Sequence, residues 1–158
     1  AQMPRDKIFD VIVSDWKKLV DQKITEHPLY LHHEGKPVLL IWGVYHGKRK
    51  NFDLDIVNRV IDFFKNNPKY GVFLVGGGQW WWDQVKHKKW AKTFRRFDAF
   101  CPWNVPTVKI KNGVKYASTE HWEESLKEAK KAGMLYIPVI FPGFSWDNMH
   151  KWPPGIIE

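Results

Sequence analysis

The segment GKPVLLIWGVY, residues 35–45, is a continuous apolar run that starts behind a glycine and a proline. Apolar residues at consecutive positions point to both faces of a strand, and strands buried on both faces are typical of parallel sheets. Three further runs have the same character: YGVFLVGGG at 70–78, FDAFCPW at 97–103 and MLYIPVIF at 134–141. The sequence therefore predicts four strands, each buried on both faces.

Helical segments separate these strands. Apolar residues recur at helical spacing, and four helices are expected, over residues 6–21, 52–67, 84–97 and 118–133. Asp53 is placed to cap the second helix, and Ser118 or Thr119 to cap the fourth, which Gly133 ends. Strands that alternate with helices form right-handed βαβ units. The pattern predicts an α/β fold with a parallel sheet, either a small open doubly wound sheet or part of a (βα)8 TIM-type barrel.

The composition fits one folded domain. The chain has 158 residues, 44% of them apolar, and a formal net charge of +8. No segment approaches the length of a membrane span, so no membrane partner is expected. The single cysteine, Cys101, lies in an apolar stretch and is expected to be a small buried thiol. Ten tryptophans exceed what a core of this size needs, and tryptophan is a common platform for flat ligands.

The tryptophans gather where the predicted strands end. Ligands of parallel α/β sheets and barrels bind beyond the carboxyl ends of the strands. Those four ends carry Trp42, residues 80–82 (Trp-Trp-Trp), Trp103 and Trp146. Three of the ends also place an amide or an imidazole beside the indole. Apolar walls with a few placed polar groups are what a sugar site requires, so this set favours a ligand site over simple plugging of the sheet end.

Several other patterns weigh against nucleotide, metal and acid–base chemistry in this chain. The glycines at 76–78 lack the dinucleotide and P-loop spacings, and they are expected to turn the backbone sharply toward a substrate. The seven histidines have no metal-ligand spacing; His46 is the functional candidate, and His121 and His150 are expected to be exposed. The only carboxylates in the strand-end loops are those of Asp83 and Asp147; either could hydrogen-bond a substrate, and nothing in the sequence pairs them as acid and base.

Four segments in this order carry a family resemblance: GKPVLLIWGV, VIDFFKNNPKYGVFLVGG, FCPWNV and YIPVIFPGFSWDNM. They resemble the middle of glycoside hydrolase family 99, the endo-acting α-mannosidases and mannanases, and the similarity covers most of the chain. The resemblance implies a (βα)8 barrel that cleaves inside α-mannan or glucosylated N-glycan chains with retention of configuration. No cofactor or metal is expected. By motif position, the substrate would be lined by Trp42, His46, Trp81, Trp82, Trp103, Asn104, Phe144, Ser145, Trp146 and Asn148.

The resemblance also implies that the chemistry lies elsewhere in the barrel. A complete barrel needs about 250 residues or more, and the family's paired catalytic glutamates lie on a strand expected beyond Glu158. Residues 1–158 are therefore expected to be a single partial barrel domain, cut at both ends and inactive alone. Its expected partners are an α-mannoside oligosaccharide or glycan and the rest of the barrel, from the same polypeptide or a second chain. The family suggests a secreted, periplasmic or secretory-pathway location.

Two other functions remain open from the sequence. The same tryptophans would also suit a non-catalytic module that binds a glycan or a protein. The basic segment KHKKWAKTFRRF, residues 86–97, could bind nucleic acid, although a solvated outer helix face explains it more simply.

Overall fold

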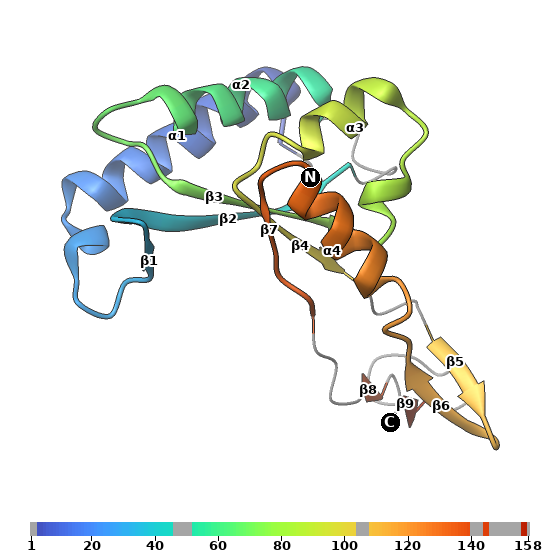
Figure 1. The fold of residues 1–158 in the computed structure, drawn as a ribbon. Coiled ribbons are helices and arrows are strands. Elements are labelled where there is room, and N and C mark those ends of the chain that lie inside the picture. Colours follow the sequence, from blue (N-terminus) through green and yellow to red (C-terminus); the bar gives the residue numbers. More distant parts are fainter. Residues whose placement is uncertain (1–2, 46–51, 104–107, 140–143, 146–155, 158) are drawn as a thin grey trace.

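The computed structural model describes residues 3–45, 52–103, 108–139, 144–145 and 156–157, the last two segments by their backbone (Figure 1). Within these residues the chain is an α/β structure with four α-helices and a mostly parallel five-stranded sheet. The helices are α1 (Arg5–Asp21), α2 (Leu54–Asn66), α3 (Lys88–Phe94) and α4 (Trp122–Lys131), with short 3-10 turns η1 (Ile24–Glu26) and η2 (Trp82–Gln84). The strands are β1 (His32–His33), β2 (Lys36–Val44), β3 (Phe73–Gln79), β4 (Ala99–Trp103), β5 (Val108–Lys111), β6 (Val114–Ala117), β7 (Leu135–Tyr136), β8 (Phe144–Ser145) and β9 (Ile156–Ile157).

The main sheet follows the order of the chain. Its strands lie in the order β1-β2-β3-β4-β7, and β2, β3, β4 and β7 are parallel, as the apolar runs predict. The short β1 pairs antiparallel with only the start of β2. Successive parallel strands are therefore neighbours, and each is joined to the next by a segment that contains a helix.

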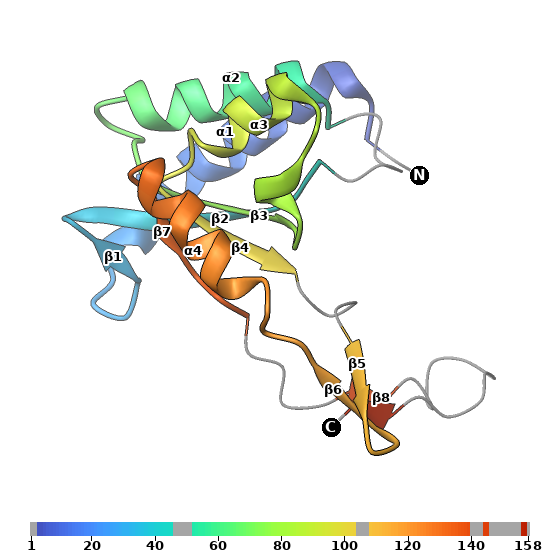
Figure 2. The same cartoon turned by 45° about the vertical axis from the view of Figure 1, so that its right-hand side comes forward.

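The helices pack on one face of this sheet. In Figure 2, α1, α2 and α3 lie above the strands, and α4 lies beside β4 and β7. Phe100 of β4 shows the packing well, because its ring contacts both Phe94 of α3, at 5.3 Å between centroids, and Trp82 of η2, at 5.0 Å. The indole of Trp16 on α1 donates a hydrogen bond of 2.9 Å to the carbonyl of Tyr70. The large apolar side chains buried between this face and the helices form the core. Burial of each one stabilises the folded state by roughly 1.5–3 kcal/mol.

The glycines of β3 make that packing possible. Gly76 and Gly78 lie inside the strand, so the sequence-based expectation of a sharp turn at 76–78 is wrong. A Cβ atom at Gly76 would lie 2.8 Å from the ring of Phe97 and 2.9 Å from that of Phe100. At Gly78 it would lie 2.7 Å from the carbonyl oxygen of Val44. These glycines therefore allow aromatic rings and a neighbouring backbone to pack closely against β3.

The opposite face of the sheet is apolar and partly exposed. The register aligns Leu40, Val75, Ala99 and Leu135 in one row across the four parallel strands. Leu40 and Leu135, on the outer strands of this row, are 51% and 49% exposed, whereas Val75 and Ala99 between them are buried. None of the described helices covers this face. The prediction of strands buried on both faces therefore holds at this row for β3 and β4, but not for β2 and β7.

Several boundaries differ from the sequence-based prediction. The helix expected over 84–97 is divided into η2 and α3, and α4 begins only at Trp122, with His121 as an N-cap that makes no side-chain hydrogen bond. The strand expected over 134–141 is regular only in β7, and residues 140–141 lie outside the described part. Phe144 and Ser145, expected in a loop, form β8 and pair with β9.

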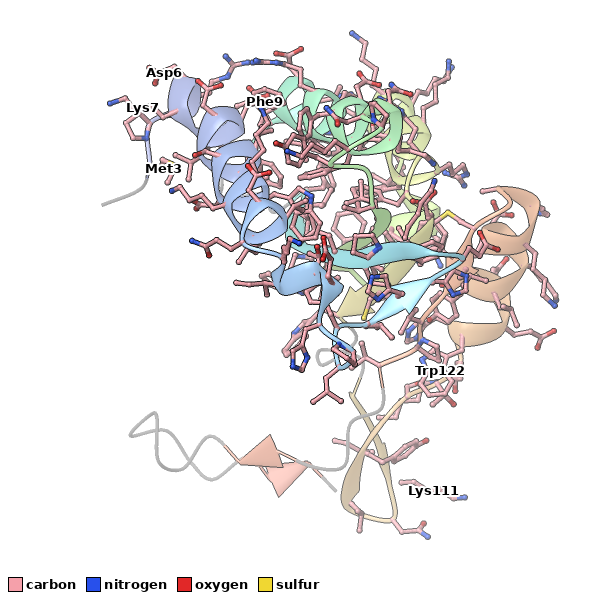
Figure 3. The ribbon with its side chains drawn as sticks, turned by 90° about the vertical axis from the view of Figure 1, so that its left-hand side faces the viewer. Met3, Asp6, Lys7, Phe9, Lys111 and Trp122 are labelled. Atoms are coloured by element: carbon pink, nitrogen blue, oxygen red, sulfur yellow. The ribbon has the colours of Figure 1, made fainter. Side chains whose placement is uncertain are left out.

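A hairpin absent from the prediction projects from the sheet. Strands β5 and β6 pair antiparallel around Asn112 and Gly113, whose φ angles are 52° and 81°. An Asn-Gly pair with two positive φ angles is the favoured two-residue hairpin turn, so the sequence carried this signal. Figure 3 shows Lys111 near the outer end of the hairpin and Trp122 where α4 begins.

The predicted cap of α2 is confirmed. Asp53 accepts hydrogen bonds of 3.1 Å from the backbone amides of Asp55 and Ile56, and Arg5 donates one of 2.5 Å to the same carboxylate. The hydrogen bond from Arg5 lowers the pKa of Asp53 below its ordinary value of 3.8. A lowered carboxyl pKa adds stability above the ordinary value, and this stability is lost as the pH falls through the folded-state pKa.

Replacing this cap tests its two parts. Asp53→Ala should lower the free energy of unfolding by about 1 kcal/mol at neutral pH, because two helix amides lose their acceptor. Asp53→Asn keeps an acceptor, so it should retain most of that stability but lose the wild type's dependence on pH below 4. Urea unfolding followed by circular dichroism measures both effects, and equal losses in the two variants would contradict the capping role.

Candidate functional site

Two exposed indoles meet at the carboxyl end of the sheet. Trp42 lies near the end of β2 and Trp103 is the last residue of β4. Their ring centroids are 6.0 Å apart and their planes meet at 81°, an edge-to-face pair. Trp42 is 44% exposed and Trp103 is 46% exposed. The two rings therefore form an apolar corner on the uncovered face, which we call the indole pair.

Gly77 allows the indole pair to form across a strand. Strand β3 lies between β2 and β4, and its Gly77 is aligned with Trp42 on one side and Cys101 on the other. A Cβ atom at Gly77 would lie 2.7 Å from Cδ1 of Trp42. Any side chain at this position would displace the indole, so the glycine lets Trp42 approach the backbone of β3 closely.

A bulge in β2 directs Trp42 away from the core. Residues 42 and 44 would share one face of a regular strand. The pairing of β2 with β3 shifts between them, and Gly43 has φ 90°. As a result Trp42 lies on the uncovered face, while Val44 is buried in the core. Bulges often re-aim side chains next to functional sites in this way.

Among the described residues, Cys101 and Gln79 are the polar side chains that strand register places near the indole pair. Cys101 is half-buried in the row next to Gly77, and burial raises the pKa of its thiol. The thiolate is the nucleophilic form, so a raised pKa makes this cysteine a poor nucleophile at neutral pH. By strand register, the polar residue expected on this face near the indoles is Gln79, aligned with Trp103.

The remaining predicted site residues fall in different places. Trp81 contacts the ring of Tyr45, which packs on Trp90 of α3, so Trp81 lies on the covered side. Trp82 is fully buried in the core, where its ring is not accessible to a ligand. Four other candidates lie outside the described residues: His46, Asn104, Trp146 and Asn148. Phe144 and Ser145 are described only as backbone in β8. Of the ten predicted residues, the structure brings Trp42 and Trp103 together.

A buried polar cluster lies on the covered side, between η2, α4 and β7. Asp83, expected as a possible substrate contact, accepts a hydrogen bond of 2.8 Å from Oγ of the fully buried Ser125. Ser125 also interacts with Tyr136, whose pKa burial raises to about 12. His121 packs against the ring of Trp80 at 5.5 Å, and its Nε2 is buried. The expectation that His121 is exposed is therefore wrong.

This cluster holds more buried polar atoms than the described contacts satisfy. Five side-chain atoms are buried without a described hydrogen-bond partner: Trp82 Nε1, Asp83 Oδ1, His121 Nε2, Trp122 Nε1 and Tyr136 Oη. Burial lowers the pKa of His121 below its ordinary value of 6.5, against an opposing effect of Asp83. A lowered histidine pKa means that the folded state resists protonation. The stability that neutral His121 contributes is therefore complete above pH 6.5 and declines as the pH falls through and below that value.

His121→Gln tests this dependence. The wild type should lose more unfolding free energy between pH 7.5 and pH 5.5 than the variant does, because glutamine does not titrate. Urea titrations at a series of pH values provide the measurement, and parallel profiles for wild type and His121→Gln would contradict the role of this residue.

The described residues contain no group of three or more His, Cys, Asp or Glu side chains that could hold a metal ion. Within the same part of the chain, no helix is long and apolar enough to cross a membrane.

Comparison of the chain with protein-family models, with curated proteins and with solved structures finds no match. The resemblance to family 99 therefore stays a prediction based on the quoted residues.

Proposed function

We propose that the sheet is part of a (βα)8 barrel and that its uncovered face is the barrel interior. Three observations support this proposal. The four parallel strands are neighbours in chain order, as in a barrel, whereas a doubly wound sheet reverses its order at a switch point. The helices described lie on one face only, and the other face is apolar. The remaining strands would come from the same polypeptide or from a second chain.

We further propose that the chain supplies the aromatic wall of an α-mannoside site in a retaining endo-α-mannosidase or mannanase of the family 99 type. The indole pair is the observation that carries this function. It lies at the carboxyl ends of β2 and β4, the end at which barrels bind their ligands. The C–H face of a pyranose stacks on one ring, and the second ring, at 81°, closes the corner against the edge of the sugar.

The catalytic groups of this proposed enzyme lie outside the described residues. Retaining hydrolysis uses two carboxyl groups about 5–5.5 Å apart. Among the residues described, no Asp or Glu lies on the uncovered face of the strands from β2 to β7. Asp83 is hydrogen-bonded to Ser125 on the covered side of the sheet. The proposed role of this chain is therefore to bind and orient the glycan, while the paired glutamates belong to another part of the barrel.

A second candidate is a non-catalytic module that binds a glycan or a protein. The lack of carboxylates beside the indole pair in the described part favours it. Turnover of an α-1,2- or α-1,3-mannoside by the full-length protein would decide for the enzyme. Binding without turnover would decide for the module.

Mannoside binding can be followed through the indole pair. Manno-oligosaccharide should quench or shift tryptophan fluorescence in the full-length protein, because the sugar displaces water from exposed rings. Trp42→Ala and Trp103→Ala should each weaken affinity by about 3- to 10-fold, corresponding to roughly 0.5–1.5 kcal/mol for one aromatic contact. Gly77→Ala should act in the same direction, because it displaces the ring of Trp42.

The control for these variants is Leu29→Ala, which removes an exposed apolar side chain that precedes β1, at the other end of β2 from Trp42, and should leave affinity unchanged. A folded sample that shows no fluorescence response, or indole variants that bind like wild type, would refute the proposed site.

A separate variant tests whether the uncovered face is buried inside a closed barrel. Leu40→Lys places a charge on the face at a position that is 51% exposed in the described residues. In a closed barrel the unpaired charge would be buried, which should cost about 3 kcal/mol or more. In an open sheet the cost should be within about 0.5 kcal/mol, as for other surface changes. Leu29→Lys, at an 88% exposed position off the sheet, is the matched control in urea unfolding.

A further inference from the structure

Four exposed lysines lie together on and just before α3. They are Lys86, Lys88, Lys89 and Lys92, and we call them the α3 lysine cluster. Among the described residues, none of the four forms an ion pair with a carboxylate within 4.0 Å. Many other lysines do form such pairs: Lys18, Lys23, Lys65, Lys69, Lys109, Lys127 and Lys131. Unpaired lysines also occur elsewhere among the described residues, but here four of them fall within seven positions of the sequence.

The cluster also opposes the local preferences of a helix. The first turn of a helix favours acidic side chains, because the helix dipole is positive there. The first turn of α3 holds no acidic residue and begins with Lys88 and Lys89. Lys92 stands three and four positions after them, a spacing at which like charges repel. Places where a sequence breaks such local rules are often functional.

Three carboxylates of the neighbouring elements are engaged with other groups. Asp62 of α2 pairs with Arg96, and Glu128 of α4 pairs with Arg95 at 3.0 Å. Asp98, at the start of β4, pairs with Lys65 at 2.8 Å. The described structure thus leaves the field of the α3 lysine cluster directed at solvent, where an external anion can bind.

We propose that the α3 lysine cluster binds an acidic polysaccharide, a glycan that carries carboxylate or sulfate groups. The four side chains supply this attraction, rather than the end of the seven-residue helix. A nucleic acid fits less well, because Trp90, the one tryptophan among residues 86–92, is only 8% exposed and offers little surface on which a base could stack.

The cluster is placed to act together with the indole pair. Helix α3 follows β3 through η2, so Lys86, Lys88 and Lys89 come soon after the carboxyl end of that strand, the end at which Trp42 and Trp103 lie. A glycan that crossed this end of the sheet would meet indoles on one side and lysines on the other. The choice of a glycan rests on the proposed function, whereas the charge argument does not.

Dextran sulfate and neutral dextran are the matched probes for this surface. Wild-type protein should bind dextran sulfate with an affinity that falls steeply with salt, and should not bind neutral dextran. Replacing Lys86, Lys88, Lys89 and Lys92 together by glutamine should weaken binding at least 10-fold and reduce the salt dependence. The control replaces Lys18, Lys23, Lys127 and Lys131 by glutamine. It removes the same number of charges elsewhere, and it should change the affinity for dextran sulfate less than 2-fold.

Three results would overturn the proposal: equal losses in the two quadruple variants, no binding of dextran sulfate by folded wild-type protein, or tighter binding of duplex DNA than of dextran sulfate. The test is separable from that of the indole pair. If the cluster proposal alone fails, the fluorescence response to manno-oligosaccharide persists; if the mannoside proposal alone fails, binding of dextran sulfate persists.

Discussion

The close approach of neighbouring groups to the three glycines of β3 is the constraint on which the rest of the structure depends. Gly76, Gly77 and Gly78 lie next to the rings of Phe97 and Phe100, the indole of Trp42 and the carbonyl of Val44. The first and third positions serve the core, and the middle one serves the uncovered face. Three consecutive glycines in one strand therefore allow the helix layer to pack closely and, on the other side, allow two indoles from non-adjacent strands to meet.

The arrangement separates two kinds of chemistry. The uncovered face of the sheet is apolar, with indoles at its carboxyl end. The outer helix layer carries the charge, most densely on and before α3. Between them lies a core of aromatic rings with a polar cluster around Ser125. The two proposed sites would therefore take different parts of a ligand: a sugar ring at the indole pair and negative groups at the α3 lysine cluster.

The sequence predicts the helices and strands of this fold well, because each strong periodic pattern is compatible with only one type of element. The helical stripe of α2 and its Asp53 cap are confirmed, as is the end of α4 at Gly133, whose φ is 68°. The burial pattern of strands is less informative. An apolar run indicates that both faces avoid water, but it does not say which chain covers them, and so the open face of β2 could not be predicted. The sequence alone does not distinguish a turn at residues 76–78 from a strand, because glycine suits a turn and a close contact equally well.

Site residues were predictable only in part, since position after a strand does not fix the side on which a ring lies. Trp42 and Trp82 both stand near strand ends, yet the bulge at Gly43 turns one outward while η2 carries the other into the core. The partners of Ser125 could not be found from spacing, because Asp83 and Tyr136 come from distant segments. The Asn112-Gly113 turn, by contrast, is a hairpin signal that the sequence itself carries.

The bulge at Gly43 has an evolutionary consequence. Because the chain changes face within two residues, the side chain at position 42 can vary without disturbing the packing of Val44 beneath the helices. Substitutions at 42 therefore change the contacts with Trp103 and Gly77 on the uncovered face and leave the core contacts of Val44 in place. Related chains could vary at this position while keeping the same core, provided that the glycine opposite a large side chain, at position 77, is retained.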